Sequence, residues 1–201
     1  GPEVVRTLYT AAKNLKIDVR TNTHAEQILT DKSGRVVGLK VKGKDGTYTI
    51  HSKAVVDAAG GFGANNEMVA KYVPRLKGFA TTNHPGATGD GLLLAEKIGA
   101  QLIQMDQIQT HPTVVPNVGE MITEAVRGNG AVLINKEGKR FFNELETRDK
   151  VSAAILKQKD GVAYLFFDSD MQKSLKATNN YIKQKYCLNG ATLDEVAGKM
   201  G

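Results

Sequence analysis

Apolar residues recur every three or four positions at the start of the chain and every second position soon afterwards. The first pattern predicts an amphipathic helix over Glu3–Leu15 with one buried face. The second pattern lies in short segments rich in Val, Ile and Thr, separated by turn signals at Ser33-Gly34 and Asp45-Gly46, and it predicts a small antiparallel β meander. The strands expected here are 18–23, 25–30, 35–42 and 47–52.

A continuous apolar run over 54–58 ends in a cluster of glycines. Only Asp57 interrupts the run, and Gly60-Gly61 follows it almost directly. An apolar strand that runs into glycine is typical of a buried parallel strand in an α/β nucleotide-binding fold. We therefore expect the meander to lead into such a strand. On the glycines alone, Gly60-Gly61 either lets the backbone approach a cofactor or only turns the chain.

The second half of the chain mixes short helical and strand patterns, so it predicts an α+β arrangement. Two loops are expected, at 80–91 and at 109–117, the second at a domain border. Hydrophobic periodicity and turn residues predict helices at 92–98, 121–127, 149–157, 171–177 and 193–200, and strands at 131–134, 139–142 and 162–167.

Composition excludes several classes of protein. The chain has 201 residues, of which 41% are hydrophobic and 24% charged, so it is too apolar to be disordered. The single cysteine, Cys187, excludes a disulfide framework, a Cys-ligated iron–sulfur cluster and a CxxCH haem site. No apolar run approaches the roughly 18 to 20 residues of a transmembrane helix. The net charge of +6 is spread over both halves with no basic stripe among stacking rings, so we expect no nucleic-acid partner.

No strong nucleotide-binding fingerprint is present. A G-x-G-x-x-G motif and a Walker A loop are both missing, and the glycines of 86–91 come in the wrong order. Asp90, between two of these glycines, either caps the helix that follows or touches a ligand.

A group of hydrogen-bond donors in the middle of the chain has no obvious structural role. Its members are His111, Thr123, Arg127 and Arg148. Each has a structural interpretation: Glu124 and Arg127 at i, i+3 are typical of a solvated helix face, and Arg148 next to Asp149 of a helix N-terminus. Taken together, convergent arginines match a carboxylate bidentately, so the group predicts a site for a small dianion. No metal ligands are predicted.

Four long motifs resemble the flavoprotein of fumarate reductases, in particular the soluble flavocytochrome c type with non-covalently bound FAD. They are TNHPGATGDG at 82–91, QTHPT at 109–113, MITEAVRGNGAVLINKEGKRFFNE at 121–144 and TRDK at 147–150. The resemblance covers essentially the whole chain. It implies part of a Rossmann-like FAD-binding domain with its antiparallel β meander over 1–106, and a truncated α+β capping domain over 107–201. That family carries its G-x-G-x-x-G upstream of the stretch matched here, so the chain resembles an internal fragment.

The resemblance also implies residue roles. For FAD it implies contacts at Ala25 near the adenine, at Ala59 and Gly60 beside the pyrophosphate, and at Asp90. For the substrate carboxylate it implies His111, Thr123 and Glu124. Arg148 would be the proton donor, supplied by a relay of Glu124 and Arg127.

The implied reaction reduces fumarate to succinate, by hydride transfer from flavin N5 to one alkene carbon and protonation of the other by Arg148. Acid–base chemistry alone favours Arg148 as an anion clamp, because the pKa of arginine lies above about 12. The relay allows Arg148 to act as the donor, because Glu124 and Arg127 would return a proton to Arg148 at once.

Two alternatives stay open at this point. Relatives of this flavoprotein reduce other unsaturated acids such as urocanate or act on ketosteroids, and the chain could instead belong to a non-catalytic flavin-binding or structural module. The resemblance implies a small dicarboxylate as substrate and an electron-donor domain or protein outside this chain. We expect the isolated chain neither to retain FAD nor to reduce fumarate.

Overall fold

The computed structural model describes residues 1–200 and divides into two compact units. Unit 1 comprises residues 1–62 and 87–104, and unit 2 comprises 63–86 and the chain from Met105 onwards. The border near residue 106 between a flavin-binding and a capping domain stays a prediction.

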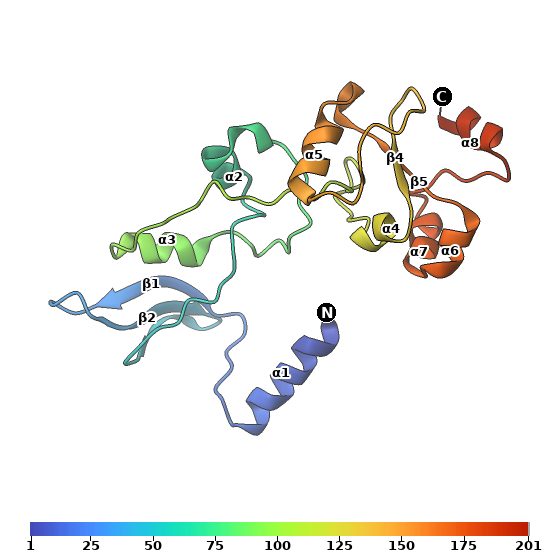
Figure 1. Cartoon of the computed structure of the whole chain (residues 1–201). Helices are drawn as coiled ribbons and strands as arrows, with labels where there is room; N and C mark the ends of the chain where they lie inside the picture. The colour runs from blue at the N-terminus through green and yellow to red at the C-terminus, as the bar shows by residue number, and fades with distance from the viewer. Residues whose placement is uncertain (201) are drawn as a thin grey trace. The chain divides into compact units, whose positions relative to one another are not determined.

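Unit 1 contains the predicted meander. Its elements are α1 (Pro2–Asn14), β1 (His24–Thr30), β2 (Val36–Gly43), β3 (Gly46–His51) and α3 (Asp90–Lys97) (Figure 1). The three strands pair antiparallel in the order β1-β2-β3. Local chemistry closes both hairpins: the Asp31 carboxylate accepts from the backbone N–H groups of Ser33 and Arg35 at 2.9 and 3.0 Å, and Gly46 takes the positive φ of +119° that the second turn requires. Ile28 and Val41 of the sheet and Leu94 of α3 are buried.

Two segments of unit 1 that were predicted to be buried are exposed. The helix α1 is present, but none of its residues is buried, and Leu8 on its apolar face is 65% exposed. The segment 54–58 is not a strand, and Val56 is 87% exposed. A parallel strand exists only through hydrogen bonds to neighbouring strands, and no described strand pairs with 54–58. The strand expected at 18–23 is likewise irregular backbone.

Unit 2 is built mainly of short helices around a two-stranded sheet. Its elements are α2 (Asn66–Tyr72), the 3-10 helix η1 (Pro74–Leu76), α4 (Glu124–Gly128), β4 (Val132–Ile134), α5 (Arg148–Leu156), the 3-10 helix η2 (Lys159–Gly161), β5 (Tyr164–Phe166), α6 (Ser169–Ser174), α7 (Ala177–Lys183) and α8 (Leu193–Met200). Strands β4 and β5 pair antiparallel, with Leu133 opposite Leu165.

Two hydrophobic clusters hold unit 2 together. One joins α4, α6 and α7 through Val126, Met171 and Tyr181, and the other joins β4 to α5 through Leu133 and Val151. Partly buried Leu165 of β5 packs against both clusters. In Figure 1, α5 lies on one side of the β4–β5 ribbon and the α6–α7 pair on the other. The start of α4 and the start of α5 are therefore fixed by buried side chains two residues further along α4, at Val126, and three residues further along α5, at Val151.

Most elements predicted for unit 2 are confirmed, and the differences have local causes. Helix α4 starts at Glu124 because Thr123 caps it, and the segment 139–142 forms a single antiparallel bridge, Ile134 with Arg140, in place of a strand. The helix expected at 171–177 is divided between α6 and α7. Helix α2 was not predicted, although Asn65 caps it by accepting from the N–H of Met68 at 3.0 Å.

The mixed helix-and-strand class is confirmed, and every strand pairing among residues 1–200 is antiparallel. Over the same residues, no helix has the length and apolar character to cross a bilayer. Nor do the described His, Cys, Asp and Glu side chains gather in any group of three or more suited to a metal ion.

Candidate active site

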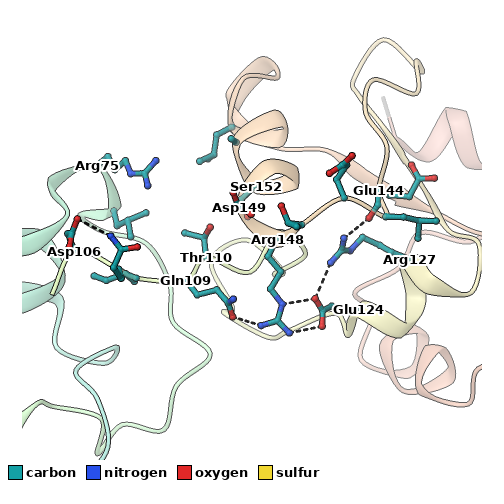
Figure 2. A pocket seen from close by; sticks show the side chains of 18 of the residues that line it. Arg75, Asp106, Gln109, Thr110, Glu124, Arg127, Glu144, Arg148, Asp149 and Ser152 are labelled. Atoms are coloured by element: carbon teal, nitrogen blue, oxygen red, sulfur yellow. Dashed lines mark hydrogen bonds and ion pairs between the residues drawn. The ribbon is translucent and has the colours of Figure 1, made fainter. Parts of the chain in front are cut away.

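A cavity of about 1110 Å³ lies within unit 2, where α4 and α5 begin (Figure 2). Its walls come from η1, the segment 106–110, the two helix starts and the loop 144–147. Gln109, Glu124, Arg127 and Arg148 all line it. The structure thus brings together residues that lie up to 39 positions apart in the sequence.

The start of α4 is set by Thr123. Its Oγ1 accepts from the N–H of Ala125 at 3.3 Å, and its own N–H donates to the hydroxyl of Tyr181 at 3.2 Å. Val126 in the next turn is completely buried. With the helix held at both points, Glu124 and Arg127, three positions apart, lie on the same side and within reach of each other.

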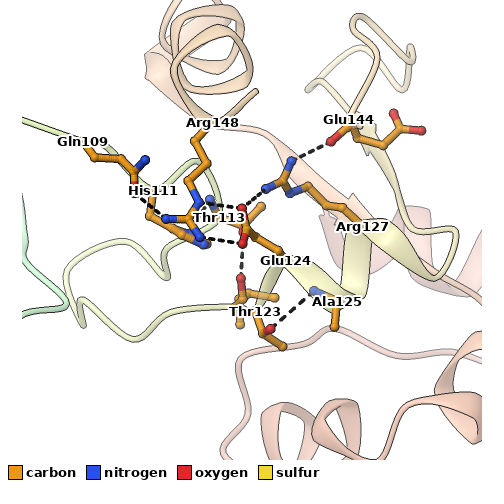
Figure 3. Close-up of polar contacts among 10 residues, drawn as sticks. Gln109, His111, Thr113, Thr123, Glu124, Ala125, Arg127, Glu144 and Arg148 are labelled. Carbon is orange, nitrogen blue, oxygen red and sulfur yellow. Dashed lines mark hydrogen bonds and ion pairs between the residues drawn. The ribbon is translucent and has the colours of Figure 1, made fainter. Parts of the chain in front are cut away.

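Glu124 and Arg148 form a two-pronged ion pair. Nε and Nη2 of Arg148 donate to the two carboxylate oxygens of Glu124 at 2.5 and 2.6 Å, and Nη1 donates to Oε1 of Gln109 (Figure 3). Arg148 is the first residue of α5, so the loop 109–113, α4 and α5 meet at its guanidinium. This geometry is the fork-to-fork arrangement that makes Arg–carboxylate pairs specific.

Arg127 lies behind this pair and is only 5% exposed. Its Nη2 is 3.6 Å from Oε1 of Glu124, and its Nη1 donates to the backbone carbonyl of Glu144 at 2.6 Å. Its Nε is buried and has no partner among the described residues. Glu124 therefore lies between two guanidinium groups.

His111 is a neutral donor. Its Nδ1 accepts from the backbone N–H of Thr113 at 3.3 Å, while Thr113 itself is fixed by donating through Oγ1 to the carbonyl of Ile122 at 2.7 Å. Because Nδ1 carries the lone pair, the proton of the neutral ring lies on Nε2. That nitrogen is buried and unpaired within residues 1–200. Burial, and then the positive charge of Arg148, lower the pKa of His111, so the ring is uncharged at neutral pH.

The charges of the site favour an anion. The hydrogen bond from Arg148 lowers the pKa of Glu124 to about 2, and the same bond raises the pKa of Arg148. Burial, opposed by Glu124, lowers the pKa of Arg127. Two positive groups and one negative group are thus charged at neutral pH. A buried donor without a partner, such as His111 Nε2, is an exception that points to a ligand.

Three of the four predicted flavin contacts meet in unit 1. Ala59 donates its N–H to Oδ1 of Asp57 at 3.0 Å, and the N–H of Gly89 donates to the carbonyl of Gly61 at 3.1 Å, which joins the loop of Ala59 and Gly60 to the start of α3. Gly60 has a φ of +84° and open space where a Cβ would stand. A backbone bare of side chains can approach a large anionic group closely.

Asp90 is not the cap of α3, which was one of its two interpretations. The N-cap is Gly89, with a φ of +80°, and Asp90 is the exposed first residue of the helix. At the next residue, a Cβ on Gly91 would stand 2.3 Å from Oδ1 of Asp57, so any larger residue there would displace the Asp57 carboxylate. For Asp90, the other interpretation, a ligand contact, stays a prediction.

Ala25, the fourth predicted flavin contact, lies apart on β1. It lines a smaller cavity of about 420 Å³ in unit 1, together with the polar Asp18, Arg20 and Thr23 and the apolar Leu39, Val41 and Ile50. These apolar side chains give the cavity a floor that suits a flat ring.

Two residues of the site were missed by the sequence analysis. Gln109 accepts a hydrogen bond from Arg148 through its side-chain oxygen, and Glu144 accepts one from Arg127 through its backbone carbonyl. Gln109 stands in the QTHPT motif beside His111, which was a usable signal. Glu144 gave only the weak signal of an Arg140–Glu144 pair at i, i+4, a spacing that is common on exposed helices.

Comparison with known proteins gives a consistent result. The sequence model of the FAD binding domain family matches residues 1–187. The chain is 53% identical over 183 residues to a fumarate reductase (cytochrome) of Shewanella frigidimarina, covering 90% of this chain and 32% of that protein. It is 47% identical over 163 residues to a urocanate reductase of Eggerthella lenta, covering 79% of this chain and 27% of that protein.

A solved structure agrees with these relatives. The open conformation of a flavocytochrome c3 fumarate reductase superposes with a TM-score of 0.81 at 43% identity, over 100% of this chain and 36% of that one. The resemblance expected from the motifs is confirmed. The chain spans about a third of the length of the relatives it matches.

Proposed function

We infer the function from one premise: the chain belongs to the FAD binding domain family. We propose that it supplies the substrate site and part of the flavin site of an FAD-dependent reductase that converts fumarate to succinate. The 53% identity to a fumarate reductase of Shewanella frigidimarina supports this substrate. In this proposal residues 1–106 belong to the flavin-binding domain and 107–201 to the capping domain.

The observation that carries the proposal is the position of Glu124 between two arginines, beside a neutral histidine with a free donor. A substrate carboxylate would accept from Nε2 of His111, which has no other partner among residues 1–200. It would also accept from the hydroxyl of Thr123, whose oxygen already accepts from Ala125 and whose proton is therefore free to donate. Two fixed donors would orient the alkene, and orientation supplies much of the acceleration of such a reaction.

Arg148 would deliver the proton. FAD, when bound, would supply the hydride to one alkene carbon. Arg148 would give a guanidinium proton to the other carbon and recover one through Glu124, which already holds two of its nitrogens. Arg127, 3.6 Å from Glu124, would pass a proton to Glu124 and would itself be reprotonated from solvent. The low pKa of Glu124 and the raised pKa of Arg148 return the proton to Arg148 after each cycle.

The residues of unit 1 fit FAD held by contacts alone. Gly60, next to Ala59, would offer backbone without a side chain to the pyrophosphate, and Asp90 would offer a carboxylate to hydroxyl donors. Ala25 lines a cavity whose apolar part, formed by Leu39, Val41 and Ile50, would suit the adenine. Electrons would reach the flavin from a donor domain or protein outside this chain.

A second unsaturated acid has support of its own. The 47% identity to a urocanate reductase of Eggerthella lenta supports urocanate as a second candidate substrate. His111 and Thr123 would bind one carboxylate of either acid. A non-catalytic flavin-binding module is the alternative from another class.

An assay of the full-length, FAD-loaded protein decides among these. Oxidation of reduced viologen is followed with fumarate, urocanate, acrylate and an unsaturated ketosteroid. We expect kcat/KM to be highest with fumarate. A higher value with urocanate would transfer the proposal to that acid. No oxidation with any compound would favour the non-catalytic module.

A further inference from the structure

The ionic chain of the site continues beyond Arg127. Nη2 and Nε of Arg140 donate to the two carboxylate oxygens of Glu144 at 2.6 and 3.3 Å. The Glu144 side chain is 6% exposed, whereas that of Arg140 is 59% exposed. The pair therefore connects solvent to the interior beside the cavity.

Glu144 makes contacts through both its side chain and its backbone. Its carboxylate binds Arg140, and its backbone carbonyl accepts from Nη1 of Arg127 at 2.6 Å (Figures 2 and 3). That bond leaves Nη2 of Arg127 directed to Glu124, at 3.6 Å. The contacts run in one line from Arg140 through Glu144, Arg127 and Glu124 to Arg148.

The burial of Glu144 needs a reason. A carboxylate removed from water is costly unless it is paired, and its carbonyl alone could be presented by an apolar residue. Its negative charge, however, does what an apolar residue could not do: it counteracts the lowering of the pKa of Arg127. Burial and the neighbouring Arg148 lower the pKa of Arg127, while Glu124 and Glu144 raise it. Arg140 in turn compensates the charge of Glu144.

We propose that Arg140 and Glu144 are a positioning pair for Arg127: they fix its guanidinium towards Glu124. The proposal rests on the proposed function, in which Arg127 supplies protons to Glu124. In this proposal neither residue needs to touch substrate, flavin or the reacting atoms, although Glu144 also lines the cavity. They act only through Arg127.

The pH dependence follows from the groups that face Arg127. These are Glu124 on its own helix, Arg148 on α5, His111 on the loop 109–113, and Glu144. Glu144→Gln keeps the backbone carbonyl but removes one of the two negative charges. The pKa of Arg127 then falls further, so the loss of turnover at alkaline pH begins at a lower pH than in the wild type.

The test compares Glu144→Gln, Arg140→Met and Arg140→Lys in the full-length, FAD-loaded protein. A matched control is Lys199→Met, which breaks another i, i+4 ion pair, Glu195–Lys199 at 2.8 Å, on α8. We expect Glu144→Gln and Arg140→Met to lower kcat with fumarate about tenfold, with KM nearly unchanged, because the substrate contacts remain. The alkaline limb of kcat shifts to lower pH in Glu144→Gln, which removes a negative charge beside Arg127, but not in Arg140→Met, which removes a positive charge. Arg140→Lys, which keeps the charge, restores most of kcat, and the control behaves as the wild type.

Two results would overturn the proposal. One is a kcat and a pH profile in the Glu144 and Arg140 variants that match those of Lys199→Met. The other is a fall in kcat that follows lost FAD or lost folded protein, since that shows a structural role only. Should the wild type reduce none of the acids, the proposed function fails by itself. Crystal structures of the wild type and Arg140→Met then decide the positioning role: a displaced Arg127 guanidinium supports it, and an unmoved one refutes it.

Discussion

Units 1 and 2 differ most in how well their predicted functional residues are supported by packing. In unit 2, Val126 and Val151 are completely buried and Leu133 is 1% exposed, and these side chains fix the starts of α4 and α5. In unit 1, Leu8 of α1 is 65% exposed and Val56, next to the predicted flavin loop, is 87% exposed. Packing within this chain therefore holds the proposed substrate residues in place, whereas the predicted flavin contacts at Ala59, Gly60 and Asp90 are exposed.

The largest expected difference between the units is in cofactor retention. We predict that the isolated chain purifies without FAD, because Ala59, Gly60 and Asp90 offer contacts from exposed backbone and one exposed helix end only. The measurement is the flavin absorbance per mole of protein, with the full-length protein as the control. Stoichiometric yellow flavin on the isolated chain would refute this and would show that unit 1 suffices for binding.

The second-largest expected effect is a loss of turnover caused by a substitution in unit 2. Replacing Arg148 with Lys in the full-length protein keeps the positive charge but loses the two-pronged contact with Glu124. If Arg148 is the proton donor, turnover with fumarate falls by about a thousandfold, within the range of a lost general acid. Reduced-viologen oxidation measures it. Arg35→Lys, in a hairpin of unit 1, controls for the substitution type. Near-wild-type turnover of the Arg148→Lys variant would leave Arg148 as an anion clamp at most.

The contrast in packing can be measured directly. Leu133→Ala removes a buried side chain from the β4–α5 cluster and lowers the free energy of unfolding of unit 2 by about 3 kcal/mol. Leu8→Ala makes the same chemical change on the exposed face of α1 and alters stability by less than about 0.5 kcal/mol. Urea unfolding of the isolated chain, followed by circular dichroism, compares the two. Equal losses of stability would mean that α1 is packed in solution.

The smallest expected effect is electrostatic. The pKa of Glu124, ordinarily 4.5, is lowered to about 2 by its hydrogen bond with Arg148. A carboxyl with a lowered folded pKa stabilises the folded state above its unfolded pKa, and this contribution disappears as the pH falls from 4.5 towards about 2. Because the pair is partly exposed, the change in stability is small.

Carboxyl carbon NMR of the isolated chain follows the titration of Glu124. In Arg148→Gln the midpoint of Glu124 returns towards 4.5, whereas that of Asp18, which Arg20 lowers in unit 1, does not move. A Glu124 midpoint near 4.5 in the wild type would show that the ion pair is not formed in solution.

Sequence reasoning did well where the cause is local. The turn at Asp45-Gly46 and the strand β4 followed from neighbouring residues, and both are confirmed. Sequence reasoning did not predict the capping role of Thr123, since it gave that residue no structural role. It failed at 54–58, because an apolar run reports a preference for burial and strand pairing but not whether a partner strand is at hand. It also missed Glu144, whose spacing from Arg140 is typical of an exposed pair but whose side chain is buried.

By itself, the sequence determined the resemblance to fumarate reductase flavoproteins, the mixed fold class and the set of donors around His111, Arg127 and Arg148. Only the tertiary structure decided how these residues meet. Glu124 and Arg148 are 24 positions apart, and only the packing of α4 and α5 against a shared core brings a carboxylate into the fork of that guanidinium. Burial then set their chemistry, since removal from water makes His111 neutral and makes the charge of Arg127 depend on the carboxylates beside it.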